Sequence, residues 1–277
     1  MIIGRKYKIL EMIGSGCFGA IMKGENVRTN EKVAIKIEKA NSPAKILKNE
    51  ARIYVLLNKE ESIGGFPNIK WFGKDADFFY MVMDLLGPSL SSFKQQYVHQ
   101  SVNDLSLSLD VVCAIGVQII DRLRRVHETG LIHRDIKPDN LLFGLGRNIQ
   151  LIYLIDFGFC KSYLTKNNTH VQCASQTNII GTPNFVSANV HNRLTASRRD
   201  DLESVAYVLI YLFLPLNEWK MMFSDSLKEE DILKTKMTLC EHALIPSQIA
   251  NFLRCCRQLS YNETPNYEYM MSVLSQS

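Results

Sequence analysis

The chain has 277 residues, of which 46% are hydrophobic and 22% are charged, so its composition is that of an ordinary globular protein. This composition excludes a disordered or collagen-like chain, and the length fits one large domain or a two-lobed unit. The net charge of +4 comes from residues 1–86, where 14 lysines and arginines face 10 acidic residues. Such a small excess does not predict nucleic-acid binding.

Neither a membrane span nor a disulfide framework is expected. The longest apolar stretch, Val205 to Leu216, has 12 residues, fewer than the roughly 20 that cross a bilayer, and predicts a buried core helix. The seven cysteines form no C-x-x-C pair, and the start of the chain has no apolar run typical of a signal sequence. We therefore expect an intracellular protein, in the nucleus, the cytoplasm or both, without membrane insertion.

Up to about residue 86 the sequence is typical of strands. The expected strands are β-branched or aromatic runs bounded by Gly, Asn or Asp: Tyr7–Ile13, Phe18–Lys23, Lys32–Glu38, Ile69–Phe72 and Phe78–Asp84. One helix is expected from about Ala44 to Asn58, because apolar residues recur along it and Ser42-Pro43 would supply its N-cap and first-turn proline.

After Gly87-Pro88 the pattern becomes helical. The clearest apolar stripe, with steps of three and four residues, is formed by Leu109, Val112, Gly116, Ile119, Leu123 and Val126. A β-rich first part and a mostly helical second part predict an α+β protein with its working site in a cleft between the two parts.

The first motif that carries chemistry is Gly14-Ser15-Gly16-Cys17-Phe18-Gly19. The pattern G-x-G-x-x-G is a weak signal alone, because dinucleotide-binding proteins, kinases and simple turns share it. A dinucleotide fold needs a helix at the third glycine, whereas residues 20–24 and 33–36 are strand-like. The glycines are therefore predicted to lie in a hairpin whose backbone N–H groups approach phosphate oxygens.

Lys36 ends the run Val-Ala-Ile-Lys and is placed to neutralise the α and β phosphates of a nucleotide. Glu50 lies 14 residues further on, within the expected helix, and would hold the ammonium group as its ion-pair partner. The alternative for Glu50 is a solvated helix glutamate, and the spacing alone does not decide between the two.

The strongest signal is the octet from His133 to Asn140, His-Arg-Asp-Ile-Lys-Pro-Asp-Asn, followed by Asp156-Phe157-Gly158. Asp156 comes 16 residues after Asn140, which leaves room for a short hairpin. Phosphoryl transfer needs in-line positioning, charge neutralisation and an acceptor for the hydroxyl proton. Asp135 would take the proton, and Lys137 would stabilise charge on the transferring group. Asn140 and Asp156 offer the oxygen ligands that Mg²⁺ prefers.

With these motifs the chain resembles the eukaryotic protein kinases and, among them, the casein kinase 1 family. Three further segments carry the narrower resemblance over nearly the whole length: Leu85–Leu90, Ser197–Ser204 and Pro265-Asn266-Tyr267. In addition, Ser187-Ala188-Asn189 matches a Ser-Ile-Asn-like sequence of that family, where most kinases have Ala-Pro-Glu.

The resemblance implies a bilobal protein-kinase fold, with one kinase domain over residues 1–277, an N-lobe of 1–86 and a C-lobe of 87–277. It implies the use of ATP and Mg²⁺, and a lysine two residues after Asp135 is typical of serine/threonine kinases. Thr182 would be a further catalytic residue beside Asp135 and Lys137, and Asp201 would tether the catalytic loop. The nucleotide-binding residues that the resemblance implies are Ile13, Gly14, Gly16, Gly19, Ile21, Ala34, Lys36, Glu50, the gatekeeper Met83, Asp84 and Leu86.

The substrates implied are serines and threonines of acidic or phosphoprimed proteins. The family usually has Gly-Thr-Ala-Arg-Tyr where this chain has Gly181-Thr182-Pro183-Asn184-Phe185, so an amide replaces the arginine implicated in binding a priming phosphate. An amide cannot replace a bidentate, permanently charged guanidinium, so a preference for primed substrates does not follow from the resemblance. The remaining candidate contacts for acidic substrates are Arg147, Arg193, Arg198 and Arg199.

The regulatory tail common in this family is missing from the sequence, so we expect a constitutively active kinase. We also expect a monomer that binds no nucleic acid directly. The alternative is a pseudokinase or scaffold that uses the same fold for protein interaction. A change at Lys36, Asp135 or Asp156 would favour that alternative, and none of the three is changed.

Overall fold

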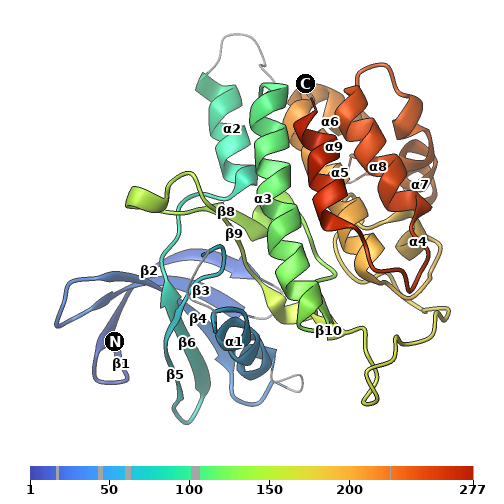
Figure 1. The fold of residues 1–277 in the computed structure, drawn as a ribbon. Helices are drawn as coiled ribbons and strands as arrows, with labels where there is room; N and C mark the ends of the chain where they lie inside the picture. The colour runs from blue at the N-terminus through green and yellow to red at the C-terminus, as the bar shows by residue number, and fades with distance from the viewer. Residues whose placement is uncertain (17–18, 43–45, 60–63, 101–106, 225, 277) are drawn as a thin grey trace. The chain divides into compact units, whose positions relative to one another are not determined.

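The computed structural model describes residues 1–16, 19–42, 46–59, 64–100, 107–224 and 226–276. They form two compact units (Figure 1), the first of Met1–Gly87 with Leu142–Gly158 and the second of Pro88–Leu141 with Phe159–Ser277. The change of pattern expected at Gly87-Pro88 lies where the chain first passes from one unit to the other.

The first unit is built on an antiparallel sheet of six strands in the order β1-β2-β3-β4-β6-β5. Each of the five predicted strands is confirmed, and β2 runs three residues beyond its predicted end; Phe18, expected to begin β3, lies outside the described residues. The strands are β1 (Ile2–Ile3), β2 (Tyr7–Gly16), β3 (Gly19–Asn26), β4 (Lys32–Lys39), β5 (Ile69–Lys74) and β6 (Phe78–Asp84).

Alternation along β4 decides where Lys36 lies. Val33 and Ile35 belong to a buried apolar cluster with Tyr7, Tyr80 and Val82. Because successive side chains of a strand point to opposite faces, Ala34 and Lys36 lie on the other face of the sheet.

Helix α1 (Ile46–Leu57) lies within the predicted range of 44–58, although Pro43 and Ala44 fall outside the described residues. Its buried side chains include Glu50 and Tyr54, two polar groups on an otherwise apolar face. Glu50 contacts Lys36, and Tyr54 contacts the backbone of Asp156, as described below.

The predicted hairpin after Asn140 is also confirmed. It consists of β8 (Leu141–Phe143) and β9 (Ile152–Leu154), with the 3₁₀ turn η2 (Gly146–Asn148) in its loop and η3 (Phe157–Phe159) after it. Two backbone hydrogen bonds, from Gly87 N–H to Phe143 O at 2.8 Å and from Leu154 N–H to Gly65 O at 2.9 Å, join this segment to the rest of the first unit.

The second unit is mostly helical. Its helices are α2 (Leu90–Gln100), α3 (Leu109–Glu128), α4 (Ala188–His191), α5 (Arg198–Phe213), α6 (Leu216–Met222), α7 (Glu229–Thr238), α8 (Ser247–Gln258) and α9 (Tyr267–Ser275). The shorter elements are the paired strands β7 (Leu131–Ile132) and β10 (Lys161–Ser162) and the 3₁₀ turns η1 (Pro138–Asn140) and η4 (Leu239–Glu241).

The core of the second unit lies around α3 and α5, which pack against each other and against α9 and α8 respectively. All members of the predicted α3 stripe are buried except Leu109, which is half-buried. Every residue of α5 from Leu202 to Leu212 is buried, which confirms the predicted core helix, although it ends at Phe213 before Pro215. Within the described ranges, no helix is both long enough and apolar enough to cross a membrane.

Candidate active site

The glycine motif lies at the end of the β2–β3 hairpin, as predicted. Gly16 and Gly19 are paired across the two strands, and Cys17 and Phe18 between them lie outside the described residues. Gly19 has a φ of 152°, and a Cβ there would collide with the carbonyl oxygen of Ile37 in β4. Glycine is therefore required at position 19 by the sheet itself.

Gly14 is different, because the neighbouring chain leaves room for a side chain there. Among the described residues, a Cβ at Gly14 would meet only Ile21, at 3.8 Å, which is ordinary van der Waals contact. Ile13 beside it is 47% exposed. Space over the half-buried backbone of Gly14 fits a ligand that approaches the N–H groups closely, as a nucleotide phosphate does.

Lys36 holds two carboxylates of the first unit. Its Nζ lies 2.8 Å and 3.0 Å from the two carboxylate oxygens of Glu50 and 2.8 Å from Oδ1 of Asp156. Lys36 is 7% exposed and Glu50 is 1% exposed, so the predicted ion pair is confirmed and the solvated alternative for Glu50 is wrong. Burial would lower the pKa of Lys36, but the two carboxylates outweigh it and the pKa is raised, which keeps the ammonium charged.

Two residues that the sequence did not single out hold this group in place. The buried carboxylate of Glu38, at the end of β4, accepts hydrogen bonds from the backbone N–H groups of Ile46 and Leu47, at 3.0 Å and 3.2 Å. It therefore caps the first turn of α1, the helix that carries Glu50. The hydroxyl of Tyr54 accepts a hydrogen bond from the backbone N–H of Asp156 at 3.0 Å.

The remaining nucleotide-binding candidates lie along β4, β6 and the chain that follows β6. Ala34 and Met83 are buried partners across β4 and β6. The backbone N–H of Asp84 donates to Asn68 O at 3.1 Å, so this N–H already has a partner within the first unit. Leu86 follows the end of β6 and is half-buried.

In the second unit, Asp135, Lys137 and Thr182 contact one another. The Lys137 ammonium lies 2.8 Å from Oδ2 of Asp135 and donates to the Thr182 hydroxyl at 3.1 Å. The backbone N–H and the hydroxyl of Thr182 both donate to Oδ1 of Asp135, at 3.1 Å and 2.8 Å. Asp135 is 3% exposed, so its carboxylate is fixed in direction by neighbours rather than by water.

Asn140 completes this set through its side-chain nitrogen, which donates to the backbone oxygen of Asp135 at 2.9 Å and to its Oδ2 at 3.2 Å. These bonds use the nitrogen, so the amide oxygen is the atom that Asn140 offers to a cation. In the first unit, the Asp156 carboxylate is 26% exposed beside Lys36. Each residue thus presents an oxygen donor of the kind that Mg²⁺ binds, so both fit the predicted ligand role.

The loop that carries Asp135 is held by α5. Asp201, in the first turn of that helix, accepts hydrogen bonds from the backbone N–H groups of His133 and Arg134, at 2.7 Å and 2.8 Å. The ring of His127 approaches the same carboxylate at 3.0 Å. Arg134 has a φ of 69°, an unusual conformation for a residue with a side chain, and the bonds from its own N–H and from that of His133 help to maintain that conformation.

A family model described as the protein kinase domain matches residues 7–273, which is nearly the whole chain. The chain belongs to the protein kinase family. The predicted bilobal α+β kinase fold is confirmed by this match and by the β-rich and helical units of the kinase. The family supports phosphotransferase activity on protein substrates with ATP and Mg²⁺.

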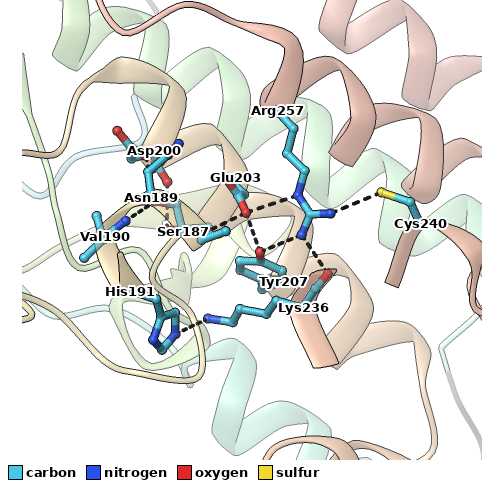
Figure 2. Close-up of polar contacts among 12 residues, drawn as sticks. Ser187, Asn189, Val190, His191, Asp200, Glu203, Tyr207, Lys236, Cys240 and Arg257 are labelled. Carbon is cyan, nitrogen blue, oxygen red and sulfur yellow. Dashed lines mark hydrogen bonds and ion pairs between the residues drawn. The ribbon is translucent and has the colours of Figure 1, made fainter. Parts of the chain in front are cut away.

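The segment 182–187 of the kinase runs from Thr182 to Ser187, the first residue of Ser187-Ala188-Asn189. The Asn184 side chain, which stands where the resembled family has arginine, donates to Phe223 O at 3.2 Å. Ser187 and Asn189 both bond the Asp200 carboxylate, and the backbone N–H of Ala188 donates to Glu203 at 3.1 Å (Figure 2). Helix α5 therefore fixes the end of this segment through two acidic side chains.

Glu203 was not singled out by the sequence analysis. In the sequence Glu203 is marked only by its place next to an apolar run. In the structure it is 1% exposed. Besides Ala188, its carboxylate meets the guanidinium of Arg257 in α8, with Nε at 3.4 Å (Figure 2). Through Glu203, the ion pair with Arg257 connects α5 and α8 to the residue that follows the segment 182–187. Because Glu203 and Arg257 are 54 positions apart, no local sequence pattern predicts the pair.

Proposed function

We propose that the kinase transfers the γ-phosphoryl group of ATP to serine or threonine hydroxyls, as enzymes of the casein kinase 1 type do. The observation that carries the proposal is the contact of Lys137 with both Asp135 and Thr182, because it places a cation beside the group that would accept the hydroxyl proton. A lysine in this position is the feature that the resemblance associates with serine/threonine specificity.

In the proposed reaction, the acceptor oxygen forms a bond to the γ-phosphorus while the bond from that phosphorus to the oxygen of the β-phosphate breaks. Asp135 takes the proton of the hydroxyl, and Thr182 keeps its carboxylate directed through two hydrogen bonds. Lys137 neutralises charge that develops on the transferring group.

On the nucleotide side, Lys36 neutralises the α and β phosphates, and Glu50 keeps its ammonium group in place. Asp156 and Asn140 each offer an oxygen ligand to Mg²⁺, which supplies Lewis-acid neutralisation of the phosphate oxygens when bound. The space above Gly14 lets the backbone approach those oxygens.

We further propose acidic substrates, with a phosphorylated residue as one source of the acidic group. In the second unit, a cavity of about 230 Å³ has Arg134, Lys161, Gln172, Gln176 and Asn178 among its lining residues, together with apolar residues such as Ile132 and Leu194. Cations together with amide donors suit a phosphate or carboxylate group.

The arginines named from the sequence contribute less to this proposal. Arg198 is 8% exposed and donates to the carbonyls of Asn262 and Glu263, and Arg199 donates to Leu259 O. Arg193 pairs with an acidic residue of α7 at 2.6 Å. Arg147 is exposed on η2 and stays a candidate.

The test is transfer from ATP with Mg²⁺ to three peptides, one phosphoprimed, one acidic and one neutral, with Asp156→Asn as the blank. We expect serine or threonine phosphorylation above the blank, with the acidic or primed peptide preferred. Nucleotide binding without transfer to any peptide would contradict the proposal and favour the pseudokinase alternative. A matched peptide with tyrosine in place of serine tests the residue specificity.

We also propose that the kinase is constitutively active, because Asp135, Lys137 and Thr182 already contact one another. Phosphatase-treated protein should retain its activity, and a requirement for treatment by another kinase would refute this. A monomeric protein in the nucleus, the cytoplasm or both, without direct nucleic-acid binding, completes the proposal. Imaging of the tagged chain and its mass in solution test these points.

A further inference from the structure

Lys236, in α7, is a lysine with 0% exposure whose ammonium group reaches the segment 182–187. Its Nζ donates to Pro183 O at 2.8 Å and to Val186 O at 2.6 Å, and it lies 3.1 Å from Nε2 of His191. Figure 2 shows it beside His191 and the ring of Tyr207, whose centroid is 4.4 Å from Nζ. Two N–H groups of the ammonium thus have a backbone carbonyl as acceptor.

Stability alone does not explain a lysine here. In the described part of the chain, no carboxylate lies within ion-pair distance of Lys236, and burial holds its pKa well below the usual range. A buried ammonium without a carboxylate partner is costly, and a well-packed apolar side chain would often be at least as stable. The ammonium donates hydrogen bonds to two backbone carbonyls, which an apolar side chain cannot do.

These two carbonyls lie in the backbone between Thr182 and the start of α4. Pro183 follows Thr182 directly, and Thr182 bonds both Asp135 and Lys137. A peptide whose hydroxyl reaches Asp135 comes close to Thr182 and to the start of the backbone that follows it. The Lys236 ammonium binds the carbonyls of Pro183 and Val186, which lie before and after Asn184 in the sequence.

We propose that Lys236 is a positioning residue for the acceptor peptide, because it fixes the backbone that follows Thr182 next to Asp135. The inference rests on the proposed function, since it assumes that Asp135 meets the acceptor hydroxyl. It assigns to α7 a role in peptide affinity, whereas the nucleotide contacts belong to Lys36 and its partners in the first unit.

The chain offers a matched control in Lys94 of α2. It is 1% exposed, donates to the carbonyls of Tyr211 and Leu214, and lies 4.7 Å from the ring centroid of Tyr211. Lys94→Met and Lys236→Met thus each remove a buried ammonium that holds two carbonyls and covers a tyrosine ring. Of these two lysines, Lys236 contacts the segment 182–187, whereas the carbonyls that Lys94 binds belong to Tyr211 and Leu214.

The experiment measures peptide affinity by fluorescence anisotropy, and KM for peptide and for ATP by phosphate transfer. We expect Lys236→Met to weaken peptide binding and raise the peptide KM by about tenfold, with the KM for ATP unchanged within about twofold. Lys94→Met should lower the melting temperature to a similar extent without this effect. Lys236→Gln, which keeps an amide donor, should fall between the wild type and Lys236→Met, and it replaces that variant if the methionine chain does not fold.

Equal peptide affinity of the wild type and the Lys236 variants would overturn the inference, as would an equal loss in Lys94→Met. If the wild type binds peptide in a Lys236-dependent way but transfers no phosphate, the inference stands and the proposed function fails. The anisotropy measurement therefore separates the two failures.

Discussion

Replacing Asp201 by asparagine removes the negative charge that accepts two backbone hydrogen bonds from the catalytic loop. The wild-type carboxylate accepts from His133 N–H at 2.7 Å and from Arg134 N–H at 2.8 Å, one bond on each oxygen. Burial would raise its pKa, but the hydrogen bond and charge of His127 and the charge and backbone N–H of His133 outweigh it, so the pKa is lowered and the group is ionised. Asparagine has the same shape but only one oxygen, so its NH₂ group must face one of the two donors.

The magnitude follows from these bonds. A hydrogen bond to a charged group contributes about 1.5–3 kcal/mol, and a buried donor left without an acceptor costs about 1–3 kcal/mol. Asp201→Asn should therefore lower the free energy of unfolding by about 3–5 kcal/mol. The positive φ of Arg134 is strained by about 1–3 kcal/mol, so the loop should also relax and carry Asp135 away from Thr182.

The assay is urea denaturation of both proteins, with kcat and the KM for ATP measured on the folded variant. We expect kcat to fall at least about 100-fold, because Asp135, the proposed proton acceptor, is displaced. Nucleotide affinity should stay unchanged, because the Lys36 group lies in the other unit. The control is Asp231→Asn, because the side chain of Asp231 is 47% exposed and pairs with Lys234; it should cost less than about 0.5 kcal/mol. A loss below about 1 kcal/mol with an unchanged kcat would refute the reasoning.

Three further predictions concern Lys36 and Glu38 in the first unit and His191 in the second. Lys36→Met leaves Glu50 buried without its cation, so we expect transfer to fall about 100-fold or more and the unfolding free energy to fall by about 3 kcal/mol, measured by kinetics and by denaturation. Glu38→Gln can accept from one α1 amide instead of two, and should cost about 1–2 kcal/mol and speed hydrogen exchange at the start of that helix; unchanged exchange there would contradict the capping role. Burial, followed by the charge of Lys236, lowers the pKa of His191 from 6.5 to about 4, so the unfolded chain binds a proton first as the pH falls. Between pH 6.5 and 4 the wild type should lose at most about 3 kcal/mol through this group, and His191→Asn should lack that part of the loss in melting curves at pH 7 and 5.

Local patterns predicted the features that depend on neighbours in sequence. The alternation of β4 both forms a strand and sends Lys36 to the face opposite Val33 and Ile35, so the sequence was sufficient to place the lysine. The start of α5 was predicted as the tether of the catalytic loop, because the resemblance assigned that role to Asp201, and two backbone bonds confirm it.

The residues that the sequence missed act over long separations. Lys236 comes shortly after the mixed charges of residues 228–234, a composition that usually marks a solvated surface, and it lies 53 positions from Pro183. Glu38 follows two residues after Lys36 and has the alternation of any strand, so nothing in the pattern distinguishes a helix cap from a solvated acid. In both cases the tertiary fold supplies the partners, and burial of a charged group is the first sign of the role.

Asn184 connects these observations to substrate choice. Its side chain donates to Phe223 O, and Lys236 holds the carbonyls before and after it, so the segment 182–187 is anchored from two directions. Asn184→Arg would remove the bond to Phe223 while it adds the guanidinium of the resembled family. Better turnover of a primed peptide would then need the Lys236 contacts to hold the segment alone. We therefore expect Asn184→Arg to favour phosphoprimed over unprimed peptides in the wild-type background and to lose that gain when combined with Lys236→Met. A gain that survives in the double variant would show that the two anchors act independently.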